Sequence, residues 1–294
     1  MVAIYVDHAL SDDARRRLLF GGALLLNSRS KATVALSNYA SSMIVEAFAP
    51  HAPETAQNDI PVQEFVERVA PLKKAFTNGL RTKELIRDML SDAGCDLADT
   101  YFDVPRMRVV PHGGYLNAGV AYAYKPHRDT WYAAPLAQIN WWMPIYAVTP
   151  ERAMSFFPEY WDKALRNSSC DFDYDEWCAV GRPGAVSQIT TDTRKHPLPL
   201  EEVSTASDLR IGGMPGDMIR FSGSHLHSTF PNVSGVTRFS ADFRTVSLED
   251  LRTRRGAPNV DSRSVGSTVR DFINAKDFTP IPDVLAFAAE EASK

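Results

Sequence analysis

Two histidines and an aspartate are placed where they could hold a metal ion. His127 and Asp129 lie two residues apart, between an apolar run and an aromatic one, and His225 and His227 follow far downstream. Two imidazoles and one carboxylate on one face of a metal leave coordination positions open for other ligands. The spacing predicts a site of His127, Asp129 and one further histidine. The choice between His225 and His227 stays open, because both lie on the same face of an extended strand.

A second group of polar residues lies on a single predicted strand. Residues 238–244 alternate charged or polar side chains with apolar ones. A charged strand face makes no sense in a dry core unless its charges are paired or bind something. The arginine fork fits a carboxylate, and a neighbouring hydroxyl can add a further hydrogen bond. We therefore expect Arg238 and Ser240 to bind an acidic ligand. The full polar face consists of Arg238, Ser240, Asp242 and Arg244.

Another strand, predicted over residues 136–148, carries two amides and an indole on one face. With a period of two, Gln138, Asn140 and Trp142 share that face, and apolar residues share the other. Buried amides need hydrogen-bond partners. A bound polar ligand would supply them, and neighbouring backbone or water would be an alternative. We expect Gln138, Asn140 and Trp142 to contact a ligand.

The elements that position these residues follow from periodicity. Apolar residues at three- and four-residue steps predict helices before Gly94, whereas valine, tyrosine and tryptophan segments between turn residues predict an antiparallel sandwich or barrel after it. The expected helices are 10–20, 31–48, 62–76, 82–92 and a short one at 283–292. The expected strands are 23–26, 107–110, 120–124, 136–148, 218–221 and 237–246.

These elements predict a mainly β fold with flanking helices, without a linker that would separate two domains. The irregular stretch 150–206 is longer than compact domains usually tolerate without a function, so it is expected to form a lid or substrate-binding wall. The expected single domain of residues 1–294 consists of a helical layer (1–95), a β-rich core (100–246, including the loop 150–206) and a C-terminal extension (247–294).

Composition narrows the choice of partners. The chain of 294 residues is 44% hydrophobic and 23% charged, with a net charge of -4, which argues against nucleic acid or an anionic membrane as the partner. No apolar run is long enough to span a membrane. The three cysteines are odd in number and lack metal or redox spacing, which favours free thiols in a reducing cytoplasm. A small molecule is the expected partner, and the oligomeric state stays open.

The order of these residues resembles the Fe(II)/2-oxoglutarate-dependent dioxygenases, in particular the phytanoyl-CoA dioxygenase-like branch. In that branch the distal strand runs from a histidine through an Asn-x-Ser turn to an arginine, as in His227, Asn232-Val-Ser234 and Arg238. The match covers residues 100–246, and the spacing of the family favours His227 over His225 as the third ligand. The resemblance implies a double-stranded β-helix (jelly-roll) core, Fe(II) on His127, Asp129 and His227, and 2-oxoglutarate on Arg238 and Ser240.

The resemblance also implies a reaction. Enzymes of this family use dioxygen and 2-oxoglutarate to hydroxylate unactivated C–H bonds, releasing succinate and CO2. Asp129 argues against halogenation, because halogenating relatives have Gly or Ala at this position. Desaturation and ring closure stay open, as does a non-enzymatic, cupin-like metal-binding jelly roll. The polar and aromatic mix in residues 150–200 favours a small polar metabolite or biosynthetic intermediate over a fatty acyl chain.

Overall fold

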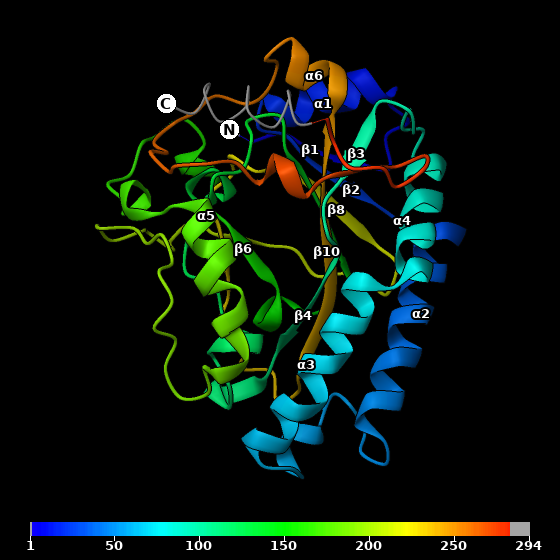
Figure 1. Ribbon diagram of the computed structural model, residues 1–294, viewed down its shortest axis with the longest axis vertical. Coiled ribbons are helices and arrows are strands. Elements are labelled where there is room, and N and C mark those ends of the chain that lie inside the picture. The colour runs from blue at the N-terminus through cyan, green and yellow to red at the C-terminus, as the bar shows by residue number, and fades with distance from the viewer. Residues whose placement is uncertain (1, 283–294) are drawn as a thin grey trace.

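Two β-sheets face each other, and helices cover the outer side of the larger sheet (Figure 1). This computed structural model describes residues 2–282, so the helix expected at 283–292 lies outside the described residues. The side chains of Trp142, Phe221, Met154 and Phe156 form one buried cluster between the two sheets. The mixed arrangement of sheets and helices agrees with the predicted fold class.

The larger sheet combines strands from both ends of the chain. Its first pair is parallel, and its other pairs are antiparallel. The strand β10 pairs with β5 along one side, and with β4 and then β3 along the other. In spatial order the strands are β1 (Ile4–Val6), β2 (Leu24–Asn27), β8 (Met218–Ser222), β5 (Ile139–Pro144), β10 (Arg238–Ser247), β3 (Thr100–Phe102) and β11 (Ile273–Asn274), with β4 (Arg106–Val110) beside β10.

The smaller sheet carries one of the candidate metal ligands. It is antiparallel and places β6 between the other two strands. Its strands are β7 (Leu209–Arg210), β6 (Met154–Phe156) and β9 (His227–Thr229). His227 is the first residue of β9 and lies opposite Phe156 of β6. The pairing of these two strands therefore fixes the position of His227.

The helices form where capping and periodicity predict them. The Ser11 side chain accepts from the Ala14 amide and caps the first helix, and Ser30 and Thr33 form a capping box on the second. All four helices predicted before Gly94 are confirmed. The helices are α1 (Asp12–Phe20), α2 (Lys31–Phe48), α3 (Val62–Asn78), α4 (Leu80–Asp92), α5 (Tyr174–Glu176) and α6 (Leu248–Arg252).

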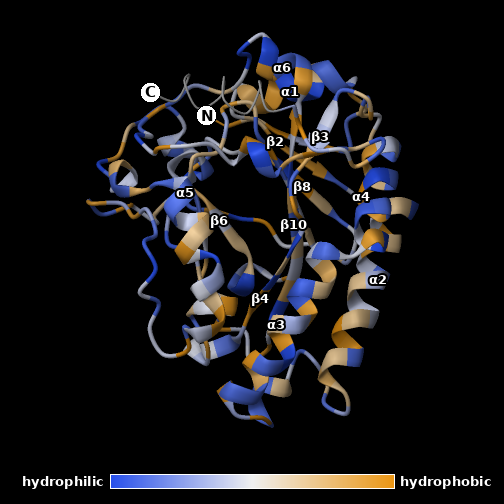
Figure 2. Cartoon of the chain, in the orientation of Figure 1, coloured by the Kyte–Doolittle hydropathy of each residue, from blue (hydrophilic) through white to orange (hydrophobic). Residues whose placement is uncertain are grey.

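Side-chain alternation decides which face of the larger sheet the helices cover. Figure 2 shows hydrophobic and hydrophilic residues mixed along α3 and α4. The buried residues of α2, α3 and α4 join one cluster with the apolar face of β5 and β10, which includes Trp141, Met143, Phe239 and Phe243. The opposite faces of β5 and β10 therefore point between the sheets, as the period-two pattern predicts.

Several sequence predictions of local structure are wrong. Residues 120–124 do not form a strand, because Gly119 has a φ of 57° and starts a tight turn. The strand expected at 136–148 is limited to β5, which ends at Pro144. In the layer 1–95 the strand predicted at 23–26 is confirmed as β2, whereas β1 was not predicted, and both strands join the larger sheet. The loop 150–206 contains β6, a strand of three residues.

Neither disulfides nor membrane spans occur in the described part of the chain. Cys95, Cys170 and Cys178 are free. Within residues 2–282, no helix combines the length and the apolarity that crossing a membrane requires.

Candidate active site

His127, Asp129 and His227 come together as one candidate metal site. Among the described residues, these three form the group whose ligand atoms all lie within 4.8 Å of one another. The distances from Asp129 Oδ1 are 3.5 Å to His127 Nε2 and 3.8 Å to His227 Nε2. The Nδ1 atoms face backbone carbonyls, of Lys125 at 2.8 Å and of His225 at 3.0 Å. Both rings thus present Nε2 to a shared point, as in histidine metal ligands whose other nitrogen donates to a carbonyl.

Backbone pairing sets these positions. His127 and His227 form an antiparallel bridge, with N–O distances of 2.9 Å in both directions. The Asp129 amide donates to the Gly223 carbonyl at 2.9 Å, where a short turn, Asp129–Tyr132, begins. Two segments that lie far apart in the sequence therefore hold the ligands by main-chain hydrogen bonds.

The other side of the Asp129 carboxylate is held by the amides of β5. Asp129 Oδ2 accepts from Gln138 Nε2 at 2.8 Å and from Asn140 Nδ2 at 2.7 Å, and Arg244 Nε lies 3.7 Å away. Oδ1 remains directed at the two histidines. The structure thus provides Gln138 and Asn140 with an acceptor that sequence reasoning missed. Their expected contact with a co-substrate stays a prediction.

The protonation states suit metal binding. Burial by itself would raise the pKa of Asp129, but the neighbouring rings of His127 and His227 and the hydrogen bond from Asn140 hold it well below its usual range. Burial and the neighbouring His127 lower the pKa of His227 to about 4. At neutral pH the aspartate is therefore charged and His227 is neutral, which is the form of each that binds a metal.

We expect Gln138→Met to weaken metal binding by about 10- to 100-fold, because partners that orient a metal ligand typically contribute that much. Methionine keeps the length of the side chain but removes the donor to Asp129 Oδ2. The measurement is a calorimetric titration of the metal-free protein with Co(II). Gln63→Met, on the exposed surface of α3, serves as the control. Equal Co(II) affinity in the two variants would show that this hydrogen bond does not tune the site.

His225 takes a different position from His227. It is fully buried, and its Nε2 lies 3.0 Å from the Gly22 carbonyl, with the Trp161 ring 4.5 Å from its own. The amide of His225 bonds the Ser222 carbonyl, so the residue lies in a turn before β9 rather than on an extended strand. The structure therefore places His227, and not His225, beside Asp129.

Arg238, Ser240 and Trp142 carry buried polar atoms without partners. Arg238 Nε, Ser240 Oγ and Trp142 Nε1 form no hydrogen bond with the described residues. Arg238 is 3% exposed, and its Nη1 donates a hydrogen bond to the Arg152 carbonyl at 3.0 Å. Burial, reinforced by Arg108, lowers the pKa of Arg238 to about 10, so it stays charged at neutral pH. Such unmet groups cost free energy unless a ligand pairs with them. The donor set fits an organic carboxylate.

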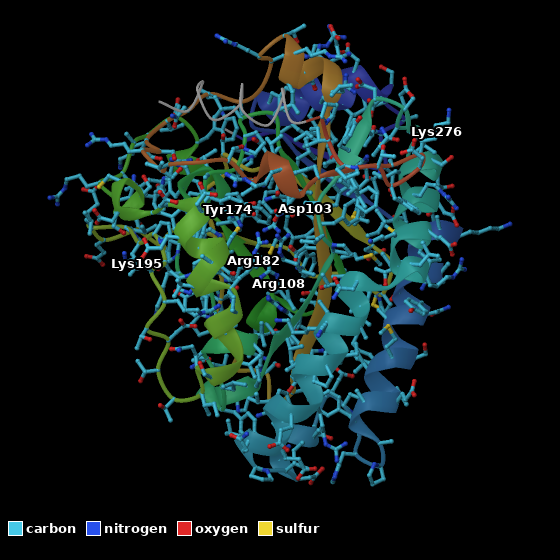
Figure 3. The ribbon with its side chains drawn as sticks, viewed as in Figure 1. Asp103, Arg108, Tyr174, Arg182, Lys195 and Lys276 are labelled. Atoms are coloured by element: carbon cyan, nitrogen blue, oxygen red, sulfur yellow. The ribbon has the colours of Figure 1, made fainter. Side chains whose placement is uncertain are left out.

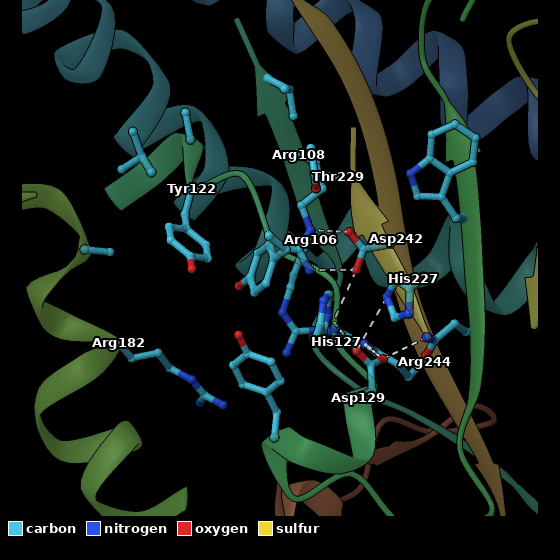
Figure 4. A pocket seen from close by; sticks show the side chains of 18 of the residues that line it. Arg106, Arg108, Tyr122, His127, Asp129, Arg182, His227, Thr229, Asp242 and Arg244 are labelled. Carbon is cyan, nitrogen blue, oxygen red and sulfur yellow. Dashed lines mark hydrogen bonds and ion pairs between the residues drawn. The ribbon is translucent and has the colours of Figure 1, made fainter. Parts of the chain in front are cut away.

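A cavity of about 300 Å³ contains the candidate metal ligands and Arg238. Figure 4 shows His127, Asp129 and His227 on its sheet side, with Arg182 opposite them. Sequence reasoning missed the lining residues Lys73, Arg106, Arg108 and Tyr132. The alternation of Arg106 and Arg108 with Met107 and Val109 resembles that of β10 and could have revealed the two arginines.

Ion pairs account for part of the charged face of β10. Asp242 accepts two hydrogen bonds from Arg108, from Nε at 2.5 Å and from Nη2 at 3.0 Å. Arg244 Nη1 lies 3.2 Å from Asp103 Oδ2. In contrast, no carboxylate lies within ion-pair distance of Arg238 in the described part of the chain. The alternating charges thus divide into internally paired residues and one arginine without a carboxylate partner among the described residues.

The segment between β6 and β7, residues 157–208, is hereafter called the insertion. It contributes Tyr174, Trp177, Arg182, Val186 and Arg194 to the cavity lining, which supports its expected role as a substrate-binding wall. Gly119 permits its close approach, because a Cβ there would lie 2.2 Å from the Ala185 carbonyl oxygen. Asp192 also accepts from the Gly119 amide at 2.9 Å.

His196 anchors the insertion as a neutral base. Its ring stacks on Tyr122 with centroids 3.8 Å apart, and its Nδ1 lies 3.2 Å from the Tyr132 hydroxyl. Burial and the nearby Arg194 lower its pKa to about 4 from the ordinary 6.5. Because the unfolded chain binds the proton more readily, this residue contributes stability above pH 6.5 that is lost as the pH falls toward 4.

We therefore expect that the free energy of unfolding of His196→Gln falls less between pH 6.5 and pH 4 than that of the unsubstituted protein. The expected difference is about 3 kcal/mol, which corresponds to the difference in the pKa of His196 between the folded and unfolded states. The measurement is the free energy of unfolding in denaturant, from neutral pH down to the lowest pH at which the native protein persists. His51→Gln, outside the cavity, serves as the control. Parallel profiles for His196→Gln and the unsubstituted protein would contradict the assignment.

The comparisons with known proteins give structural likenesses at low identity. No protein-family model and no curated protein sequence matches the chain. The crystal structure of EvdO2 from Micromonospora carbonacea var. aurantiaca is 13% identical with a TM-score of 0.45, over 83% of this chain and 93% of that one. The epimerase SnoN, solved with Fe3+, alpha ketoglutarate and nogalamycin RO, is 15% identical with a TM-score of 0.41, over 80% and 85%. The non-heme alpha ketoglutarate dependent carbocyclase SnoK from nogalamycin biosynthesis is 15% identical with a TM-score of 0.38, over 86% and 93%.

Proposed function

We propose that residues 1–294 form a single Fe(II)- and 2-oxoglutarate-dependent dioxygenase domain of the phytanoyl-CoA dioxygenase-like branch, with a double-stranded β-helix core. The observation that carries the proposal is the presence, in one cavity, of an open three-residue ligand set and a buried arginine that lacks a carboxylate partner among the described residues. A metal site alone does not need that arginine. A co-substrate that chelates the metal at one end and carries a carboxylate at the other needs both.

Each group of residues has a separate task in this proposal. His127, Asp129 and His227 would hold Fe(II) and leave the remaining positions open. Arg238 and Ser240 would bind the far carboxylate of 2-oxoglutarate, since Arg238 Nε and Ser240 Oγ are buried donors without an acceptor. Trp142 Nε1 is a further buried donor, on a ring whose centroid lies 6.0 Å from the Arg238 guanidinium carbon. Gln138 and Asn140 would keep one carboxylate oxygen of Asp129 turned toward the metal.

The reaction we propose is the hydroxylation of an unactivated C–H bond in a small polar metabolite or biosynthetic intermediate. When bound, Fe(II) with dioxygen and 2-oxoglutarate supplies an oxidant strong enough to break such a bond. One oxygen atom enters the substrate C–H bond, and the other enters succinate as CO2 is released. The chain positions the substrate and limits access of water to the cavity. The presence of Asp129 argues against halogenation, and the free cysteines fit the proposed cytoplasmic location.

The first test is anaerobic addition of Fe(II) and 2-oxoglutarate to the purified protein. We expect a weak visible absorption band from charge transfer between the metal and its chelating ligand. A protein that binds Fe(II) with no band and no 2-oxoglutarate dependence would instead be a cupin-like metal-binding module.

The second test separates the reaction outcomes. Succinate release is screened against a panel of metabolites, and each product is analysed by mass spectrometry. Hydroxylation predicts a gain of one oxygen atom. A loss of two hydrogen atoms without added oxygen would show desaturation or ring closure, and would overturn the hydroxylase assignment while keeping the cofactors.

A further inference from the structure

Basic side chains from three separate elements also line the cavity. Lys73 comes from α3, Arg106 from β4 and Arg182 from the insertion, and all three line the same cavity. Figure 3 shows Tyr174 and Arg182 on the α5 side, facing Asp103 and Arg108 on the sheet side. None of these three residues is assigned to Fe(II) or 2-oxoglutarate in the proposed function, so they are available to bind a substrate.

The guanidinium groups of Arg106 and Arg182 each form hydrogen bonds through one nitrogen only. Arg106 makes its hydrogen bonds through Nη1, to Asp103 Oδ2 at 2.5 Å and to the Val104 carbonyl at 3.2 Å. Arg182 makes its bonds through Nη2, to the Tyr174 hydroxyl and to Asp271 Oδ2 at 2.6 Å. The other N–H groups of the two guanidinium ions form no hydrogen bond within residues 2–282. Figure 4 shows Arg182 reaching into the cavity, while Arg106 enters from β4.

The local carboxylates contact only one nitrogen of each arginine, Asp103 at Arg106 Nη1 and Asp271 at Arg182 Nη2. Burial, reinforced by Arg108, lowers the pKa of Lys73 to about 7, so Lys73 is only partly charged at neutral pH. Lys73 donates to the Val120 carbonyl at 2.5 Å. Burial raises the pKa of Asp103, the partner of Arg106, to about 7, so its negative charge is only partial at neutral pH. Arg106 and Arg182 line the same cavity, and Figure 4 shows both side chains directed into it from opposite walls. An added anion would lower the electrostatic energy of the site.

Part of the remaining cavity wall is apolar. Val120 and Ala121 contribute from the turn before the candidate metal site, and Ala185 and Val186 contribute from the insertion. The Trp177 ring also lines this side. An inorganic ion would leave this surface facing water, whereas the hydrocarbon part of an organic acid would cover it.

We propose that the substrate is an organic anion, whose carboxylate or phosphate group lies between Arg106 and Arg182 and whose apolar body packs against Val120, Val186 and Trp177. This inference rests on the proposed function, and it specifies the substrate class of the same site. Arg182 belongs to the insertion and Arg106 to the β-sandwich, so one anion links the two. The two arginines act as specificity-determining residues, since a charged group that pairs with both favours acids over their neutral analogues.

The test measures binding without turnover. The protein is loaded with Zn(II), which is redox-inert, and with saturating 2-oxoglutarate, whose own binding heat is recorded first. Phenylacetate is then titrated by calorimetry and compared with its uncharged isostere phenylacetamide. We expect phenylacetate to bind at millimolar concentration or below, and at least about tenfold more tightly than phenylacetamide. Phenyl phosphate in a third titration distinguishes a carboxylate site from a phosphate site.

A pair of variants locates the anion. Arg182→Gln removes the charge at a side chain that is 41% exposed, so the fold should tolerate it. We expect it to weaken phenylacetate binding by about tenfold and to leave phenylacetamide unchanged. Arg166→Gln, on the same insertion but 75% exposed and outside the cavity lining, should change neither.

Three results would overturn the proposal: no binding of either anion at millimolar concentration, equal binding of phenylacetate and phenylacetamide, or an equal loss in Arg182→Gln and Arg166→Gln. Failure of the proposed function would be recognised separately, because 2-oxoglutarate would then give no heat in the first titration. Loss of that heat with phenylacetate binding intact would retain the anion site and reject the dioxygenase.

Discussion

Asp129→Ala is expected to abolish metal-dependent turnover. The substitution removes the anionic ligand of the proposed site and leaves the two imidazoles. Since substitutions that only disturb the orientation of a ligand typically cost 10- to 100-fold, the loss of the ligand itself should reduce succinate release by at least about a thousandfold. The measurements are the iron content of the reconstituted protein and the rate of succinate release with 2-oxoglutarate.

The same substitution should also affect stability. Asp129 is 5% exposed and accepts from both Gln138 and Asn140, so alanine leaves two buried amide donors without an acceptor. Each such group costs about 1–3 kcal/mol, partly offset because a buried charge is removed. Folding is therefore checked by thermal unfolding of the metal-free proteins. Asp162→Ala, at an exposed position of the insertion, serves as the control. Iron binding and turnover retained in a folded Asp129→Ala protein would rule out this residue as a ligand.

Arg238→Ala is expected to raise the 2-oxoglutarate concentration needed for half-maximal activity by roughly 30- to 5000-fold. That range corresponds to about 2–5 kcal/mol, the cost of truncating one member of a buried, hydrogen-bonded charge pair. Arg238 has an unpaired Nε, no carboxylate partner among the described residues and a single hydrogen bond, to the Arg152 carbonyl, so most of the effect should fall on ligand binding. The measurement is the dependence of succinate release on 2-oxoglutarate at a fixed substrate concentration.

Two comparisons make this result specific. Ser240→Ala removes a neutral donor and should raise the same requirement by roughly 2- to 10-fold. Arg210→Ala, on β7 and paired with Asp208 outside the cavity, should leave it unchanged. The substrate concentration for half-maximal activity, measured at saturating 2-oxoglutarate, should be similar in all three proteins. An unchanged 2-oxoglutarate requirement in Arg238→Ala would show that another cation binds this carboxylate.

Asp242 lies on the same face of β10 as Arg238 and has an internal partner. Because Arg108 engages both oxygens of Asp242, that carboxylate is satisfied internally. Arg238 is a buried guanidinium of the cavity wall whose Nε has no hydrogen-bond partner among the described residues. Burying a cation without an internal partner costs free energy. Such an arrangement is expected where a ligand supplies the opposite charge.

The sequence alone determined features that depend on local spacing. The separation of His127 and Asp129 and the alternation along β5 and β10 are properties of neighbouring residues, so they predict which side chains share a face. The helices of residues 10–92 followed from periodicity and capping for the same reason. The apolar faces of β5 and β10 contact those helices as predicted, and Arg238 lies on the cavity side.

Only the tertiary structure decided which distant groups meet. Because His225 and His227 are two residues apart, a strand pattern places them on the same face. In the structure, a turn directs His225 toward the Gly22 carbonyl, and the β-bridge with His127 places His227 at the candidate metal site. Gln138 and Asn140 have their acceptor on a separate segment.

The basic residues of the cavity wall also could not be predicted from spacing along the sequence. Lys73, Arg106 and Arg182 come from a helix, a strand and the insertion, and no local pattern relates them. The short strands β1 and β6 are stabilised by pairing rather than by their own residues. Long-range contacts of this kind depend on how the chain folds back on itself. Spacing along the sequence therefore identified the candidate metal ligands and Arg238, whereas folding built the cavity wall around them.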